Sequence, residues 1–285
     1  MKKWMRKDNF ISLAIMLIVI VGLLAISQIS PRKFYPYEGD ENLQVVFMGD
    51  SNMAYAFDSD SLPDMLAGAG GYTVFNVAVG GSAAARINTV GNPERGEDLF
   101  GFHHLTKIAI TQDYQSVVAL ETEANGEMIG RIACITDIDW SKMDYIVLSY
   151  GLNDYTVGIP ASGEDALDET TYSGALRAGI QRLQEISDAT IILSSITYTA
   201  HSDEAGSAYD GYEKDFGGGT IDAYRDAAAQ VASEFENVIF MDALAEMEID
   251  FTNYETYLLD SMHFNRAGRE KYLECLMTVL EKEQE

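Results

Sequence analysis

The sequence predicts an α/β domain, built as a three-layer α/β/α sandwich around a central parallel sheet of five strands. Apolar runs of strand length alternate along the chain with segments whose apolar residues recur at helical spacing. Several of these runs are apolar almost throughout, as strands are when helices cover both faces of the sheet. Hydrophobic residues make up 47% of the 285 residues, which is enough for the core of such a domain.

The expected elements follow one another from residue 44 to residue 281. The strands are expected at Gln44–Met48, Thr73–Val77, Tyr145–Ser149, Thr190–Ser195 and Val238–Met241. The helices are expected at Asn52–Ala67, Asp98–Thr111, Thr171–Ser187, Ile221–Phe235 and Arg266–Glu281. Thr220 is a suitable cap for the fourth of these helices. Residues 92–139 fit the alternation least. Within them, Glu121–Glu127 is interpreted as a loop or hairpin.

The N-terminal segment predicts one transmembrane helix. Phe10–Ile29 is a stretch of 20 residues without a charge, and four basic residues precede it, which favours a cytoplasmic N-terminus. The alternative is a cleaved signal peptide with Ala25-Ile26-Ser27 at its cleavage site. We therefore expect an anchor or signal peptide at 1–30, a tether at 31–42 and the folded domain at 43–285. Both interpretations place the domain outside the cytoplasm.

The charge of the chain restricts its partners. After position 33 there are 13 basic and 44 acidic residues, a net charge of −31. Such a surface repels phosphate backbones, so nucleic-acid binding is excluded, whereas neutral or cationic substrates remain compatible. The two cysteines, Cys134 and Cys275, are compatible with a disulfide or with two buried free thiols. Neither has a second Cys or a His at the spacing of a zinc site.

Candidate residues for a catalytic site follow each of the first three strands. Ser51 follows the first strand, Gly81 the second and Asn153 the third, while Asp260 and His263 precede the last helix. The carboxyl ends of parallel strands meet at one edge of a sheet, so these residues are expected to lie together. A serine hydroxyl becomes a good nucleophile when a base takes its proton.

His263 is the histidine with a suitable partner. Asp260 lies three residues before it, within reach of Nδ1, which leaves Nε2 to serve as the base for Ser51. The backbone N–H groups of Ser51 and Gly81, with the side-chain amide of Asn153, are candidate donors to an oxyanion. Each fragment alone also has a structural interpretation, as a helix cap or a turn.

Four sequence blocks in this order resemble those of the GDSL esterases of the SGNH hydrolase superfamily. The blocks are Gly49-Asp50-Ser51, Asn76–Gly81, Gly151–Asp154 and Asp260–His263. The resemblance implies a flavodoxin-like sandwich with strand order 2-1-3-4-5, no metal or cofactor, and ester hydrolysis by a Ser-His-Asp triad. Asn52 replaces the usual Leu after the serine, a change that is not expected to threaten catalysis. Because Gly80 and Gly81 are adjacent, the choice of Gly81 as donor depends on the alignment.

The sequence thus predicts a membrane-anchored, extracytoplasmic serine esterase with Ser51 as nucleophile, His263 as base and Asp260 as the orienting carboxylate. An O-acetylated glycan of the cell envelope is the first expected substrate, followed by lipids and small esters. Two alternatives remain open: an O-acyltransferase using the same triad, and a surface binding module that has lost activity. A dinucleotide-binding domain is excluded because no Gly-x-Gly-x-x-Gly follows the first strand.

Overall fold

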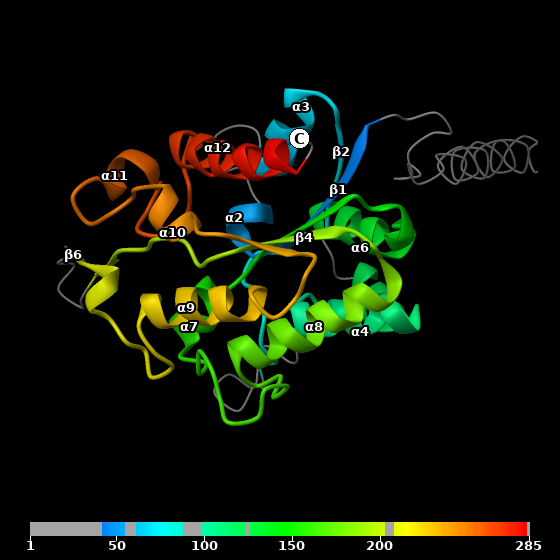
Figure 1. Ribbon diagram of the computed structural model, residues 1–285, viewed down its shortest axis with the longest axis horizontal. Coiled ribbons are helices and arrows are strands. Elements are labelled where there is room, and N and C mark those ends of the chain that lie inside the picture. Colours follow the sequence, from blue (N-terminus) through cyan, green and yellow to red (C-terminus); the bar gives the residue numbers. More distant parts are fainter. Residues whose placement is uncertain (1–41, 55–60, 88–97, 123–125, 203–207, 284–285) are drawn as a thin grey trace, which may run out of the picture. The chain divides into compact units, whose positions relative to one another are not determined.

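A five-stranded parallel sheet lies at the centre of the computed structural model, which describes residues 42–54, 61–87, 98–122, 126–202 and 208–283 (Figure 1). The strands are β1 (Leu43–Gly49), β2 (Tyr72–Asn76), β3 (Tyr145–Ser149), β4 (Thr190–Ser194) and β7 (Val238–Met241). Their order is β2-β1-β3-β4-β7, and every neighbouring pair is parallel. All five strands lie within one or two residues of the ranges predicted from the sequence. The strand order also matches the one that the family resemblance implied.

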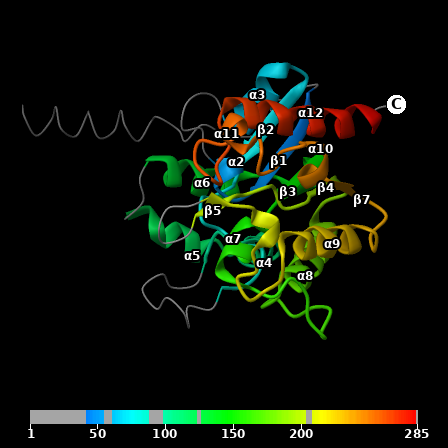
Figure 2. The same cartoon turned by 90° about the vertical axis from the view of Figure 1, so that its left-hand side faces the viewer.

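Helices cover both faces of this sheet. On one face α3 (Leu62–Ala69) packs beside α12 (Arg266–Lys282), and on the other α4 (Phe102–Thr111), α8 (Tyr172–Ile186) and α9 (Ile221–Ala232) lie side by side (Figures 1 and 2). Every residue of β3 is buried, as its apolar sequence requires in this setting. The middle of the sheet is therefore buried on both faces. Polar residues gather where the strands end.

Shorter elements connect these layers. The helices among them are α2 (Ser51–Ala54), α5 (Gln115–Val118), α6 (Gly126–Asp137), α7 (Leu152–Val157), α10 (Ala243–Glu246) and α11 (Tyr254–Tyr257). Three single 3-10 turns occur at η1 (Ala119–Thr122), η2 (Trp140–Lys142) and η3 (Gly211–Glu213). A small antiparallel pair is formed by β5 (His201–Ser202) and β6 (Ala208–Tyr209).

Two predictions about local structure were wrong. The single helix expected at Asn52–Ala67 is instead two helices, because Ser61 starts α3 with a reciprocal capping box to Asp64 and Pro63 occupies its first turn. The loop or hairpin expected at Glu121–Glu127 is also wrong for its described residues, since Glu121 and Thr122 end η1 and Gly126 and Glu127 begin α6. Residues 123–125 lie outside the described ranges. The described residues of 92–139 contain α4, α5, η1, α6 and no strand. Apart from that first helix, the predicted helices begin and end within four residues of the observed ones.

The predictions for the N-terminal segment concern residues outside the described ranges. The chain divides into two units, Met1–Tyr35 and Pro36–Glu285, and all described residues belong to the second. The predicted membrane span Phe10–Ile29 lies in the first. In the ranges given above, no helix is long and apolar enough to cross a membrane. Cys134 and Cys275 are both buried and both free thiols, which answers the question left open between a disulfide and two thiols.

Candidate active site

Ser51 lies at the carboxyl end of β1, an inner strand of the sheet, where the chain turns into α2. Gly49 allows this tight turn, since a Cβ there would lie 2.6 Å from the Ser149 carbonyl oxygen and 2.7 Å from Cγ of Met53. The N–H of Asp50 donates to the same Ser149 oxygen at 3.3 Å, so β3 fixes the start of the turn. Ser51 is 7% exposed and lies at the edge of the sheet where β1 ends.

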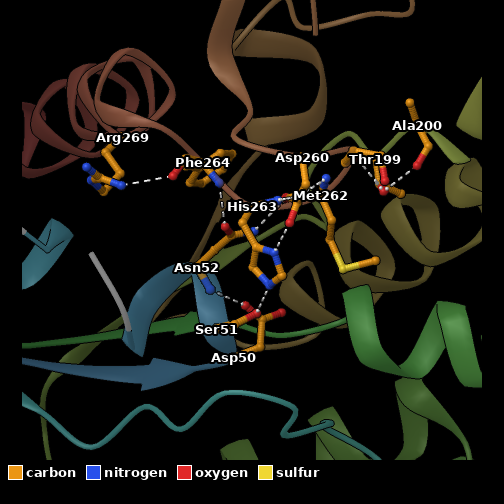
Figure 3. Close-up of polar contacts among 11 residues, drawn as sticks. Asp50, Ser51, Asn52, Thr199, Ala200, Asp260, Met262, His263, Phe264 and Arg269 are labelled. Carbon is orange, nitrogen blue, oxygen red and sulfur yellow. Dashed lines mark hydrogen bonds and ion pairs between the residues drawn. The ribbon is translucent and has the colours of Figure 1, made fainter. Parts of the chain in front are cut away.

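The structure brings Ser51, His263 and Asp260 into one chain of hydrogen bonds (Figure 3). Nε2 of His263 lies 3.0 Å from Oγ of Ser51, and Nδ1 lies 2.8 Å from Oδ2 of Asp260. The other carboxylate oxygen, Oδ1 of Asp260, accepts the backbone N–H groups of Met262 and His263, each at 2.7 Å. One oxygen of Asp260 thus fixes the loop and the other orients the imidazole.

The electrostatics of Asp260 suit an orienting carboxylate. Partial burial acts to raise its pKa, but the hydrogen bonds from the His263 ring and from the two backbone N–H groups outweigh burial. The pKa of Asp260 is therefore held below its ordinary value, and the group is a carboxylate at neutral pH. A carboxylate in this place accepts from Nδ1–H of His263 and so leaves the lone pair of Nε2 facing Ser51.

The two further predicted oxyanion donors lie on neighbouring segments. Gly81 is in a turn after β2, with a φ of +84° that favours glycine. Asn153 is the second residue of α7, and its Nδ2 donates to the Ser82 carbonyl oxygen at 2.9 Å, which joins α7 to the Gly81 turn. An amide NH₂ has two donors, so one remains to serve a substrate oxygen. The N–H of Val79, just before the turn, donates to the Gly49 oxygen at 3.2 Å, close to Ser51.

Two carboxylates that sequence reasoning missed, the buried Asp154 and the partly buried Asp98, hold the segment after Gly81. Asp154 accepts the N–H groups of Ala84 at 2.9 Å and Ala85 at 2.8 Å, and Asp98 accepts that of Ala83 at 3.0 Å. Burial raises the pKa of Asp154 to about 6, against the lowering effect of its two backbone bonds. The pKa of Asp98 is raised for the same reason. In the sequence, Asn153-Asp154 alone looked like a turn, because the partners of Asp154 are about 70 residues away.

The loop that carries His263 is held from its other side. The Ser261 carbonyl oxygen accepts from the N–H of Ala200 and from Oγ1 of Thr199, both at 2.9 Å. The Phe264 carbonyl oxygen accepts from Nη1 of Arg269 at 2.9 Å, and this arginine is buried in α12 (Figure 3). A buried guanidinium requires such a partner. Neither Thr199 nor Arg269 stands out in the sequence, because their partners lie elsewhere in the chain.

The other histidines lie elsewhere. His103 is fully buried in α4, and His104 on the same helix bonds Oγ of Ser116 at 2.9 Å. His201 is buried against the rings of Phe216 and Tyr155. No three His, Cys, Asp or Glu side chains are grouped to hold a metal ion anywhere in the part of the chain that the structure describes.

A family model and several solved structures resemble this chain. The model of the GDSL-like Lipase/Acylhydrolase family matches residues 47–271. A crystal structure from Lactobacillus plantarum is 19% identical, with a TM-score of 0.58, covering 85% of this chain and 98% of that one. A protein of Chitinophaga pinensis DSM 2588, described as a possible lipase, is 14% identical with a TM-score of 0.53, covering 85% and 98%. At these identities the two structures show a shared fold. No curated protein gives a significant match.

Proposed function

Since the chain belongs to the GDSL-like lipase/acylhydrolase family, we propose that it hydrolyses carboxylic esters through an acyl-enzyme formed on Ser51. The observation that carries the proposal is the pair of hydrogen bonds from Ser51 to His263, 3.0 Å, and from His263 to Asp260, 2.8 Å. A nucleophile, a base and a group that orients the base are the requirements of acyl transfer through serine.

In the proposed acylation, Oγ of Ser51 attacks the ester carbonyl carbon while Nε2 of His263 takes the hydroxyl proton. The carbonyl π electrons move to oxygen, and the N–H groups of Ser51 and Gly81 and the amide of Asn153 donate to the resulting oxyanion. The tetrahedral intermediate collapses, the bond to the leaving oxygen breaks, and His263 returns its proton to that oxygen. The alcohol departs and the acyl group stays on Ser51.

In the proposed deacylation, water takes the place of the alcohol. His263 removes a proton from water as the water oxygen attacks the acyl carbon, and the same donors hold the second oxyanion. The bond to Oγ then breaks and Oγ regains its proton from His263. Throughout, Asp260 stays ionised and stabilises the imidazolium, which its lowered pKa favours.

For the substrate, we propose a neutral ester outside the cytoplasm, with O-acetyl groups on an envelope glycan first. The support is the predicted membrane span at Phe10–Ile29, together with the net charge of −31 after position 33, which disfavours anionic partners. The same residues would also serve transfer of an acyl group to a sugar hydroxyl, if the acceptor occupied the place of water.

The test is turnover by the full-length chain in detergent, with aryl esters of increasing acyl length and O-acetylated sugars as substrates. Ser51→Ala should abolish turnover, whereas Ser233→Ala, at an exposed serine ending α9, should leave it unchanged. Equal activity in Ser51→Ala and the wild type would contradict the proposal. With a labelled acetyl donor and a glycan acceptor, release of label as acetate supports hydrolysis, and label on the glycan would instead identify a transferase.

A further inference from the structure

Asn52, the residue directly after Ser51, contacts the loop that carries His263 on both sides of the histidine. Its Oδ1 accepts the N–H of Phe264 at 2.9 Å, and its Nδ2 donates to the carbonyl oxygen of Met262 at 3.4 Å (Figure 3). Asn52 is 4% exposed, so these bonds lie away from bulk water. A single side chain therefore brackets His263 through the peptide groups of its two neighbours.

The other contacts of this loop lead to different parts of the fold. Arg269 holds the Phe264 carbonyl from α12, and Thr199 holds the Ser261 carbonyl from the segment after β4. Asn52 instead joins the loop to α2, the helix that begins with Ser51. The bonds of Asn52 consequently set the position of the imidazole relative to the serine hydroxyl, rather than relative to the rest of the domain.

A leucine at position 52, as is usual in the family the sequence resembles, would fill a similar volume without either bond. The N–H of Phe264 would then lose its acceptor in a place where Phe264 itself is 2% exposed. A buried N–H without a partner costs free energy, so the loop would shift to find another acceptor. Any such shift acts directly on the 3.0 Å distance between Nε2 of His263 and Oγ of Ser51.

We propose that Asn52 is a positioning residue that keeps His263 in register with Ser51 for proton transfer. The inference rests on the proposed function, because it assigns Asn52 to the same reaction. Asn52 makes its two bonds to the protein backbone, so its loss should lower kcat while leaving KM nearly unchanged. A displacement of about 1 Å between reacting groups can cost roughly 100-fold in rate, so we expect Asn52→Leu to lower kcat by about 10- to 100-fold.

The experiment compares three variants of the full-length chain with an aryl acetate. Asn52→Asp keeps the acceptor for Phe264 and loses the donor to Met262, so its kcat should lie between those of Asn52→Leu and the wild type. The matched control is Asn265→Leu, which removes the cap of α12, where Oδ1 accepts the Gly268 N–H at 3.1 Å. This control should lower thermal stability and leave kcat nearly unchanged. The proposal would be overturned if Asn52→Leu lost no more activity than Asn265→Leu for the same loss of thermal stability.

A double variant tests whether Asn52 acts through His263. In a His263→Ala background, Asn52→Leu should add no further loss of kcat, because the group it positions is already absent. An equal loss in both backgrounds would contradict the positioning role. A crystal structure of Asn52→Leu gives a readout that needs no activity: the distance from Ser51 to His263 should lengthen, and an unchanged 3.0 Å would count against the proposal.

These readouts separate the two proposals. If the wild-type chain turns over no ester and a fluorophosphonate fails to label Ser51, the proposed function is wrong. The Ser51–His263 distance in the Asn52→Leu crystal structure would still decide the positioning role of Asn52. If the wild type is active and Asn52→Leu equals it in kcat, the proposed function stands and the role of Asn52 is wrong.

Discussion

The two loops that bear the proposed catalytic groups are held by different chemistry. The His loop, residues 259–264, is fixed from outside by an amide, a hydroxyl and a guanidinium, from Asn52, Thr199 and Arg269. From within it is fixed by the Asp260 carboxylate, whose pKa is held below its ordinary value. The oxyanion loop, residues 81–85, is fixed mainly by the carboxylates of Asp98 and Asp154. An amide and a hydroxyl do not titrate in the range in which proteins work, whereas a carboxyl group with a raised pKa can.

This difference has a consequence for pH. Burial raises the pKa of Asp154 to about 6, close to the conditions in which a protein works. The amide of Asn52 and the hydroxyl of Thr199 do not change their charge over the same interval. A change of pH should therefore act on the oxyanion loop through the Asp154 carboxylate that restrains it.

The largest expected effect comes from the His loop. His263→Ala removes the proposed base and should lower kcat/KM by roughly 10⁴-fold or more, as removal of a triad member does in serine hydrolases. The control is His104→Ala on α4, which should remain active. The ring of His104 bonds Ser116, 12 positions further along the chain. Steady-state kinetics with an aryl acetate measures both. Comparable activity in the two variants would mean that His263 matters no more for catalysis than His104 does.

On the oxyanion side, Asn153→Ala should be the next most severe change. It removes a proposed donor and should cost about 2–4 kcal/mol of transition-state stabilisation, or roughly 30- to 10³-fold in kcat. Part of the loss would come through the turn, since Asn153 also bonds the Ser82 carbonyl. Asn237→Ala, at the start of β7, is the matched control: Asn237 bonds the Ala189 carbonyl at 3.3 Å. A kcat for Asn153→Ala within a factor of two of this control would speak against the donor role.

Asp154→Asn should affect stability, through the oxyanion loop. The substitution keeps one acceptor but places an NH₂ group against the N–H of Ala84 or Ala85, which leaves a buried donor unpaired. We expect the free energy of unfolding in urea at pH 8 to fall by about 1–3 kcal/mol. Asp226→Asn, at a largely exposed carboxylate on α9, is the control and should have almost no effect. Equal unfolding midpoints would mean that Asp154 does not restrain the loop.

The smallest expected effect is the pH dependence of that stability. The pKa of Asp154 is higher in the folded chain, about 6, than its ordinary value of 3.8, so protonation favours the folded state. The resulting stabilisation is complete below the unfolded pKa and disappears as pH rises through 6. Between pH 8 and pH 5 the wild type should gain about 1 kcal/mol from this group, a gain that Asp154→Asn lacks. Parallel pH profiles of the two chains in urea unfolding would contradict this.

The sequence predicted the sheet and the approach of Ser51 to His263 because both depend on local patterns. Apolar runs define the strands, strand ends meet at one edge, and Asp260 reaches His263 within one turn of chain. Asn52, Asp154 and Arg269 were not found as supports, since a single polar residue does not indicate a partner far away in the sequence. Asn52 and Phe264, for example, are separated by 212 positions.

The errors have a similar origin. Asn52–Ala67 has helical periodicity, but the capping box of Ser61 and Asp64 starts a new helix within it. Glu121–Glu127 has the polarity of a loop, yet helices occupy the described residues around it because their apolar faces pack against the rest of the domain, as Ile132 and Ile135 of α6 do. Local composition was a poor guide where tertiary packing decided the structure.

The central claim is that His263 activates Ser51 as the nucleophile, and covalent labelling tests it most directly. The full-length chain and its His263→Ala variant would be treated with a fluorophosphonate, digested, and analysed by mass spectrometry for the modified serine. We predict one adduct, on Ser51, which forms in the wild type and is strongly slowed in His263→Ala. An adduct on another serine, or labelling of Ser51 at the same rate in both chains, would contradict the claim.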